Sequence, residues 1–155
     1  MKVVGRYSRL VVNVLVLLVV FVVPAIAQQP NKVPRIGYLN GGSSSVIADR
    51  IEAFRQGLRD IGYIEGKNIV IEYRWAEGKN ERLQELAAEM VRLNVDIIVA
   101  AGPGPILAAK QATSTIPIVM PVVVNPVGSG LVNSLARPGG NLTGFTSQVD
   151  ELPGK

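Results

Sequence analysis

The 155-residue sequence contains no cysteine and no histidine. Without cysteine the chain has no disulfide, no thiolate nucleophile and no cysteine that could carry a lipid anchor. Without histidine, a Ser-His-Asp triad, a Cys-His pair and a zinc site built on imidazole are all excluded within this sequence. Several common routes to hydrolytic and metal-dependent catalysis are therefore closed before any motif is considered.

Nucleotide-binding motifs are also missing. No GxGxxG sequence follows the first predicted strand, and no GxxxxGK[ST] loop occurs anywhere in the chain. No pair of carboxylates has a spacing typical of acid–base catalysis, so we expect no catalytic residues, no metal site and no cofactor. One enzymatic alternative stays open, an exported flavodoxin-like enzyme with Ser44 or Glu77 as its catalytic group.

The first 27 residues have the layout of a secretory signal. Three basic residues precede an apolar run over residues 10–23, which only Asn13 interrupts, and small residues lead to a cleavage site after Ala27. A retained membrane anchor is the alternative, but the run is shorter than the roughly 18 to 20 apolar residues that span a bilayer. We expect cleavage near Ala27 and a periplasmic or otherwise extracytoplasmic product.

The excess of positive charge belongs largely to this segment. The chain has 16 basic and 12 acidic residues, a net charge of +4. Residues 1–27 hold three of the basic residues and none of the acidic ones, which leaves thirteen against twelve and a net charge of +1. No basic cluster remains beyond residue 27, so we expect no nucleic-acid partner.

From residue 33 onward, short apolar runs alternate with amphipathic stretches. Asn80 is expected to cap a helix, Gly62 to end one and Pro138 to stop one. Apolar and polar residues alternate over 67–75, as they do in strands near a sheet edge. The continuous apolar runs 95–102 and 116–124 are typical of strands covered on both faces. The predicted strands are 33–40, 67–75, 95–102, 116–124 and 141–148, and the predicted helices are 47–61, 80–91, 105–115 and 127–140.

This alternation of strand and helix predicts parallel strands joined by right-handed crossovers, and hence a three-layer α/β fold with a doubly wound parallel sheet. Ligands of such sheets bind beyond the carboxyl ends of the strands. The loops at 40–45, 75–78, 101–105 and 125–130 follow predicted strands. From them we predict nine ligand-binding residues: Asn40, Gly42, Ser43, Ser44, Trp75, Ala101, Gly102, Asn125 and Pro126.

Each prediction has a structural alternative. The N–H groups and hydroxyls of residues 42–45 can receive a carboxylate or phosphate, or one serine can simply cap the following helix. Asn125 can hydrogen-bond a polar ligand or start a turn before Pro126. Trp75 can stack on a planar ligand, whereas Tyr38 is expected in the core. The prolines of residues 102–105 remove N–H donors, so this loop is expected to be a rigid wall.

Several stretches carry a family resemblance: "EAFRQGLRDIGYIEGKNIVIEYRWAEGKN", "AAKQATSTIPIV", "NPVGSGLVNSLARPGGNLTG" and "ELPGK". They resemble the substrate-binding components of bacterial ABC transporters, of the tryptophan/tyrosine type with a periplasmic-binding-protein type I architecture. The resemblance covers residues 34–155. It implies two similar α/β lobes joined by a hinge, which hold a small organic ligand, in some members an aromatic amino acid, and a membrane permease as partner.

On this resemblance, residues 28–33 are a linker, 34–150 the first lobe and 151–155 the start of the hinge crossover, with the second lobe absent from the sequence. Family members carry Asp where Asn125 stands and a small polar residue where Pro103 stands, so a carboxylate for a ligand amine and a hydroxyl contact are missing here. The implied function is the solute-binding component of an ABC importer. The alternative to a fragment is a nonfunctional copy, and a lone lobe is expected to bind its ligand weakly.

Overall fold

The computed structural model describes residues 32–136 and 139–147, and the structural statements below concern these residues. Every helix and strand described here belongs to one compact unit of the chain, Val33–Lys155. The expected signal segment and the expected start of the hinge lie outside the described residues. None of the described helices has the length and apolar character needed to cross a bilayer.

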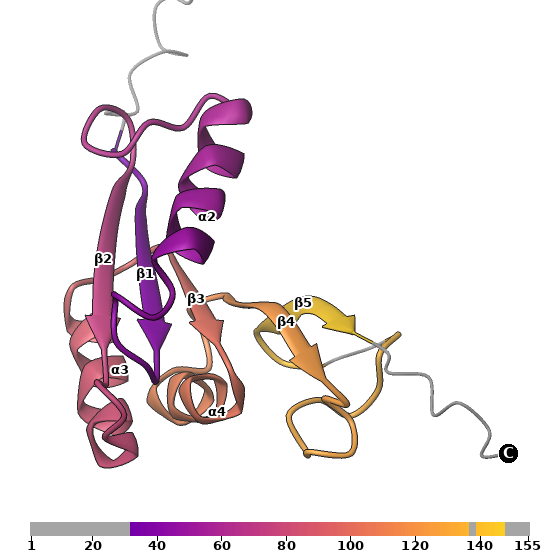
Figure 1. The fold of residues 1–155 in the computed structure, drawn as a ribbon. Helices are drawn as coiled ribbons and strands as arrows, with labels where there is room; N and C mark the ends of the chain where they lie inside the picture. The colour runs from indigo at the N-terminus through magenta and orange to yellow at the C-terminus, as the bar shows by residue number, and fades with distance from the viewer. Residues whose placement is uncertain (1–31, 137–138, 148–155) are drawn as a thin grey trace, which may run out of the picture. The chain divides into compact units, whose positions relative to one another are not determined.

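Five parallel strands form one sheet in the order β2-β1-β3-β4-β5 (Figure 1). From β1 the chain steps to β2 on one side, and the later strands are added on the other side, which is the order of a doubly wound sheet. The predicted fold class is confirmed. The strands are β1 (Arg35–Asn40), β2 (Val70–Trp75), β3 (Ile97–Ala101), β4 (Ile118–Val124) and β5 (Leu142–Ser147).

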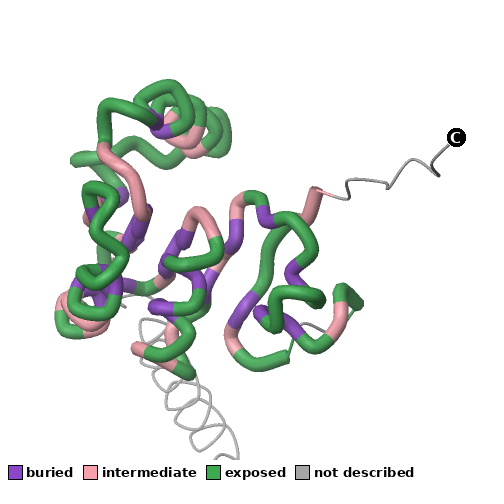
Figure 2. The backbone as a smooth tube through the Cα atoms, turned by 60° about the horizontal axis from the view of Figure 1, so that its bottom comes forward, coloured by how far each residue is buried: buried purple, intermediate pink, exposed green. Residues whose placement is uncertain are grey.

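Helices cover the two faces of the sheet unequally. The helix α2 (Ala48–Asp60) packs on one face. On the other face lie α3 (Leu83–Arg92), which follows the short 3₁₀ helix η2 (Asn80–Arg82), and α4 (Pro103–Ala112). Figure 2 shows the buried positions concentrated along the strands between these layers.

The end of α2 agrees with the sequence prediction for Gly62. Gly62 has φ +90°, its N–H donates to Arg59 O at 2.9 Å, and the Tyr63 N–H donates to Leu58 O at 2.8 Å. This pair of bonds is the Schellman arrangement, which satisfies helix-end carbonyls and favours glycine at the left-handed position. Ile61, the last residue of the helix predicted over 47–61, is 70% exposed because the helix has already ended there.

The helix cap predicted at Asn80 is wrong, and the serine cap that was one alternative for residues 42–45 does not form. Asn80 begins η2 instead of capping α3, and its side chain makes no cap hydrogen bond. No serine caps α2 either, because the residue before the helix is Ile47, which is 6% exposed. Burying a large aliphatic side chain stabilises by roughly 1.5–3 kcal/mol, more than the typical 1 kcal/mol of a polar cap.

The predicted helix over residues 127–140 is also wrong. Described residues 125–136 form turns over 126–130 followed by irregular backbone, and the Ser129 N–H donates to Asn125 O at 3.1 Å and the Leu131 N–H to Pro126 O at 2.9 Å. Gly130 has φ +69°, which a continuing right-handed helix does not allow. The Lys110 ammonium of α4 holds this segment by donating to Leu131 O at 2.7 Å.

Among the described residues, no helix covers the α2 face of the sheet beyond β3, so these residues do not provide the cover on both faces predicted for 116–124. Val122 and Val124 of β4 are 60% and 57% exposed, and Phe145 of β5 is 74% exposed. On this face α2 is the one described helix, and the apolar cluster beneath it extends no farther than Val119. We call Val122, Val124 and Phe145 the bare face.

Candidate ligand-binding site

Three predicted site residues lie side by side at the carboxyl end of the sheet. Asn40 of β1 is in register with Trp75 of β2 and with Ala101 of β3. Residues in register on neighbouring strands project to the same face. Trp75 and Ala101 pack against the apolar cluster under α2, so the side chain of Asn40 points to that face as well. The structure therefore brings these three predicted positions together at one rim.

This rim contains the switch point of the sheet. The chain leaves β1 toward β2 on one side, and β3 lies on the other side of β1. The loops that follow β1 and β3 therefore diverge, and the crevice between them is the usual ligand site of doubly wound sheets. Asn40 and Ala101 are the paired strand ends that border this crevice.

Asn40 is the one buried polar residue among those that the structure describes, with 8% of its surface exposed. Its side-chain Oδ1 accepts a hydrogen bond from Gly42 N at 2.7 Å. Its main-chain oxygen accepts from Ala76 N at 3.0 Å, and the Gly78 N–H donates to Gly41 O at 2.8 Å. These bonds tie the loops after β1 and β2 together and fix the position of the Asn40 amide.

The loop of residues 41–46, which we call the serine loop, extends from this rim toward the start of α2. The hydroxyls of Ser43 and Ser45 lie 3.1 Å apart, whereas Ser44 is exposed and lines a cavity together with Trp75. Gly42 and Ser43 are half-buried beside Asn40. The structure thus keeps Gly42, Ser43 and Ser44 at the same rim as Asn40.

The cavity that Ser44 and Trp75 line has a volume of about 510 Å³ and lies between α2 and β2. A second cavity of about 300 Å³ shares Glu52 and Arg55 with it. Sequence reasoning did not predict this groove. The shared face of Tyr73 and Trp75 on one strand was a signal for it. The first cavity is lined by Ser44, Ala48, Asp49, Ile51, Glu52, Arg55, Tyr73 and Trp75.

One wall of this groove is formed by the stacked rings of Tyr73 and Trp75, and Arg55 hydrogen-bonds to Tyr73 beside them. The rings of Tyr73 and Trp75 stack with centroids 5.6 Å apart and planes at 14°. Arg55 Nε donates to Glu65 Oε2 at 2.7 Å and to the Tyr73 hydroxyl at 3.1 Å. Burial, followed by the charge of Glu65, raises the pKa of Tyr73. The Arg55 charge is therefore engaged within the protein and supports the wall.

The loop after β3 turns sharply into α4. Gly102 has φ +100° and Pro103 is the first helical residue. Pro103 and Pro105 supply no N–H groups at this helix start, as the rigid-wall interpretation requires. Ala101 and Gly102 are half-buried at the rim. No cluster of three or more acidic residues that could hold a metal ion occurs in the described part of the chain.

The fourth loop stands apart from the other three. Val99 of β3 is in register with Val119, so β4 continues beyond the level of Ala101 before it ends at Val124. Asn125 follows with φ +46°, and its Oδ1 accepts from Gly128 N at 2.9 Å. Pro126 is buried and does not face solvent. The structure therefore does not bring Asn125 level with Asn40, and Asn125 also serves the turn that the structural alternative foresaw.

Comparison with known proteins identifies the family of this chain. A profile of the family described as "ABC transporter substrate binding protein" matches residues 43–153. The chain belongs to this family. A tyrosine-binding protein of Clostridioides difficile is 40% identical over 98 residues, which are 63% of this chain and 28% of that protein.

Three solved structures share the fold of this chain. A ligand-free, open substrate binding protein with adhesive properties from Clostridium difficile is 30% identical, with a TM-score of 0.69 over 76% of this chain and 41% of its own. A domain in complex with L-Trp from Streptococcus pneumoniae is 25% identical, with a TM-score of 0.68 over 74% and 39%. A conserved domain protein from Vibrio cholerae is 32% identical, with a TM-score of 0.69 and the same coverage. The chain thus spans less than half the length of these relatives.

Proposed function

We propose that the chain is part of the extracytoplasmic solute-binding component of an ABC importer and supplies one of two lobes that close on a small organic ligand. The observation that carries this proposal is the alignment of Asn40, Trp75 and Ala101 at the switch point, in a chain of this family. By their names, two relatives bind tyrosine or L-Trp. An aromatic amino acid or a similar molecule is therefore the proposed ligand.

The proposed mechanism is capture without chemistry. In the open form each lobe offers one face of the site, and the ligand shifts the population toward the closed form because it contacts both faces there. The loops after β1, β2 and β3 contribute Asn40, Gly42, Ser43, Ser44, Trp75, Ala101 and Gly102. The fourth loop contributes Asn125, which Pro126 anchors. The closed complex then docks on a membrane permease.

This mechanism predicts weak binding by the chain alone. A lone lobe makes only part of the ligand contacts, while the loss of translational and rotational freedom on binding stays the same. Calorimetry with amino acids and nucleobases is therefore expected to show no micromolar affinity. A micromolar dissociation constant for the 155-residue chain would mean that the site is complete within one lobe.

Fluorescence of Trp75 tests the positive side of the proposal, because Trp75 is the single tryptophan of the sequence. We expect L-tyrosine at millimolar concentration to change its emission, and L-alanine at the same concentration to leave it unchanged. If no aromatic amino acid alters the emission up to its solubility limit, this rim does not bind that class of ligand.

We also propose export with loss of residues 1–27. The intact mass of the product recovered from the periplasm of an expressing bacterium should match a chain that begins at Gln28. A recovered product that retains Met1 would show that the segment stays attached.

A further inference from the structure

We infer that this lobe meets the hydrogen-bond acceptors of its ligand, a carboxylate or carbonyl oxygen, through the side-chain N–H groups of Asn40 and Asn125. The inference rests on the proposed function and adds to it which end of the ligand this half of the site receives.

The first donor is the amide nitrogen of Asn40. The Asn40 Oδ1 accepts from Gly42 N at 2.7 Å, which identifies the other amide atom as the Nδ2 donor. Within the described residues this Nδ2 has no protein partner, although Asn40 is only 8% exposed. Since no fully buried side-chain nitrogen or oxygen lacks a partner there, Nδ2 must reach solvent. A nearly buried amide thus presents one open donor at the switch point.

The second donor is the side-chain amide nitrogen of Asn125, whose amide packs against Gly128. The Asn125 Oδ1 accepts from Gly128 N at 2.9 Å, so its carbonyl oxygen is also used within the protein. A Cβ atom at residue 128 would lie 2.3 Å from Asn125 Nδ2, so the amide rests directly against the Gly128 backbone. This packing fixes the Asn125 amide, and its Nδ2 donates to no protein group within the described residues, while Asn125 is exposed to solvent.

Each amide therefore has an unused N–H donor, while its oxygen already accepts one hydrogen bond from the protein. A carboxylate or carbonyl oxygen would complete the unused donor bond at both positions, which an ammonium group cannot do. Because the two amides lie at different levels of the rim, each is expected to meet a different acceptor oxygen or a different part of an extended ligand.

Two probes with the same ring separate the acceptor from the donor end of an amino acid. Indole-3-propionate has a carboxylate and no amine, and tryptamine has an amine and no carboxylate. In a ¹⁵N-labelled chain, we expect millimolar indole-3-propionate to shift the side-chain NH₂ signals of Asn40 and Asn125. Tryptamine at the same concentration should leave both signals in place.

The variant Asn125→Asp keeps the acceptor for Gly128 N and replaces the free donor by a charged acceptor. We expect its apparent affinity for indole-3-propionate to fall about tenfold, the size of one hydrogen bond to a charged group. The matched control is Asn94→Asp, which makes the same change at another asparagine in the left-handed conformation, φ +51°. Asn94 precedes β3 and so lies at the amino-terminal ends of the strands, away from the rim. This control should keep the affinity of the unchanged chain.

The outcomes distinguish this inference from the proposed function. Tryptamine shifting the two NH₂ signals while indole-3-propionate leaves them in place would overturn the inference and leave the ligand site standing. Equal acid affinity in Asn125→Asp and in the unchanged chain would remove Asn125 from it. If neither probe nor L-tryptophan moves any signal of the rim, the inference and the proposed function fail together.

Discussion

At the scale of single residues, Gly144 is the position with the least freedom to change. It lies in β5 with φ +149°, paired with Met120 of β4. A Cβ atom there would lie 2.1 Å from Met120 O, a backbone atom that cannot move without breaking the strand pair. The β4–β5 pair thus depends on the absence of one side chain.

Substitution of Gly144 by alanine should therefore lower the free energy of unfolding by at least about 2 kcal/mol, measured by urea denaturation. The matched control is Gly57→Ala in α2, where a Cβ atom meets nothing within 4 Å. That change should raise stability by roughly 0.5–1 kcal/mol, because alanine favours helix over glycine. Equal effects of the two substitutions would contradict this account of β5.

Residue-level prediction from sequence was good for turns and poor for caps. The position of Asn40 at the end of an apolar run was enough to place it at the rim, and Gly62 ends α2 as expected. The caps failed because burial of Ile47 decides where α2 begins, and local preference carries no information about burial. The hydrogen bond from Gly128 N that fixes the Asn125 amide depends on the geometry of the turn, which local residue preference did not predict either.

At the scale of elements, α2 is held to β1 and β2 by an aromatic cluster. The ring of Tyr38 lies 5.4 Å from Phe54 of α2, 6.0 Å from Tyr73 and 5.8 Å from Trp75, centroid to centroid. Burial raises the pKa of Tyr38, with Arg50 acting in the opposite direction, and burial and Glu65 raise the pKa of Tyr73. Tyr38 belongs to the apolar cluster under α2, and Tyr73 packs against it.

These shifts predict a loss of stability at alkaline pH. The folded chain holds the phenol protons to higher pH than the unfolded chain, so their contribution is fully present below about pH 10 and falls as pH rises beyond it. Urea denaturation at about pH 9 and about pH 11 should show this fall, and Tyr38→Phe should reduce it. The control Tyr63→Phe, at a residue that is 40% exposed, should not. A fall of equal size in both variants would contradict the role of Tyr38.

Element prediction succeeded where apolar periodicity was strong. All five strands lie within or close to the predicted ranges, as do α2, α3 and α4. The helix predicted over 127–140 was wrong because its apolar residues Leu131 and Val132 are buried although they lie in an irregular segment and not in a helix. Periodicity reports which residues face the core and does not specify the backbone that carries them there.

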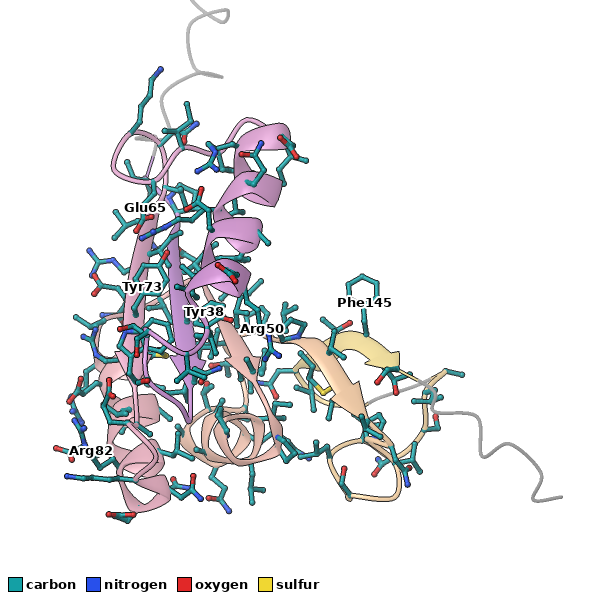
Figure 3. The ribbon with its side chains drawn as sticks, in the orientation of Figure 1. Tyr38, Arg50, Glu65, Tyr73, Arg82 and Phe145 are labelled. Atoms are coloured by element: carbon teal, nitrogen blue, oxygen red, sulfur yellow. The ribbon has the colours of Figure 1, made fainter. Side chains whose placement is uncertain are left out.

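At the scale of the whole molecule, the described part of the chain leaves the α2 face of its sheet uncovered over β4 and β5. Phe145 projects away from β5 in Figure 3, and Val122 and Val124 lie exposed on β4. Contiguous exposed apolar side chains bind hydrophobic probes and favour association. The sequence did not predict this, because a continuous apolar run looks the same whether one or two faces are covered.

Phe145→Ser should therefore reduce binding of a hydrophobic fluorescent dye and reduce self-association in light scattering, with little change in unfolding free energy. Val46→Ser is the control, because Val46 is 80% exposed on the serine loop and not part of the bare face. Unchanged dye binding by Phe145→Ser, or an equal loss in Val46→Ser, would contradict the description of this face.

The central claim is that the strand-tip rim forms one half of a ligand site, and the most direct test is a map of backbone amide shifts as L-tryptophan is added to the ¹⁵N-labelled chain. The account predicts shifts at residues 40–45, 101–102 and 125, with saturation only at millimolar concentration. Shifts confined to Asp49, Arg55 and Tyr73 would place the ligand in the groove between α2 and β2 and would contradict the claim.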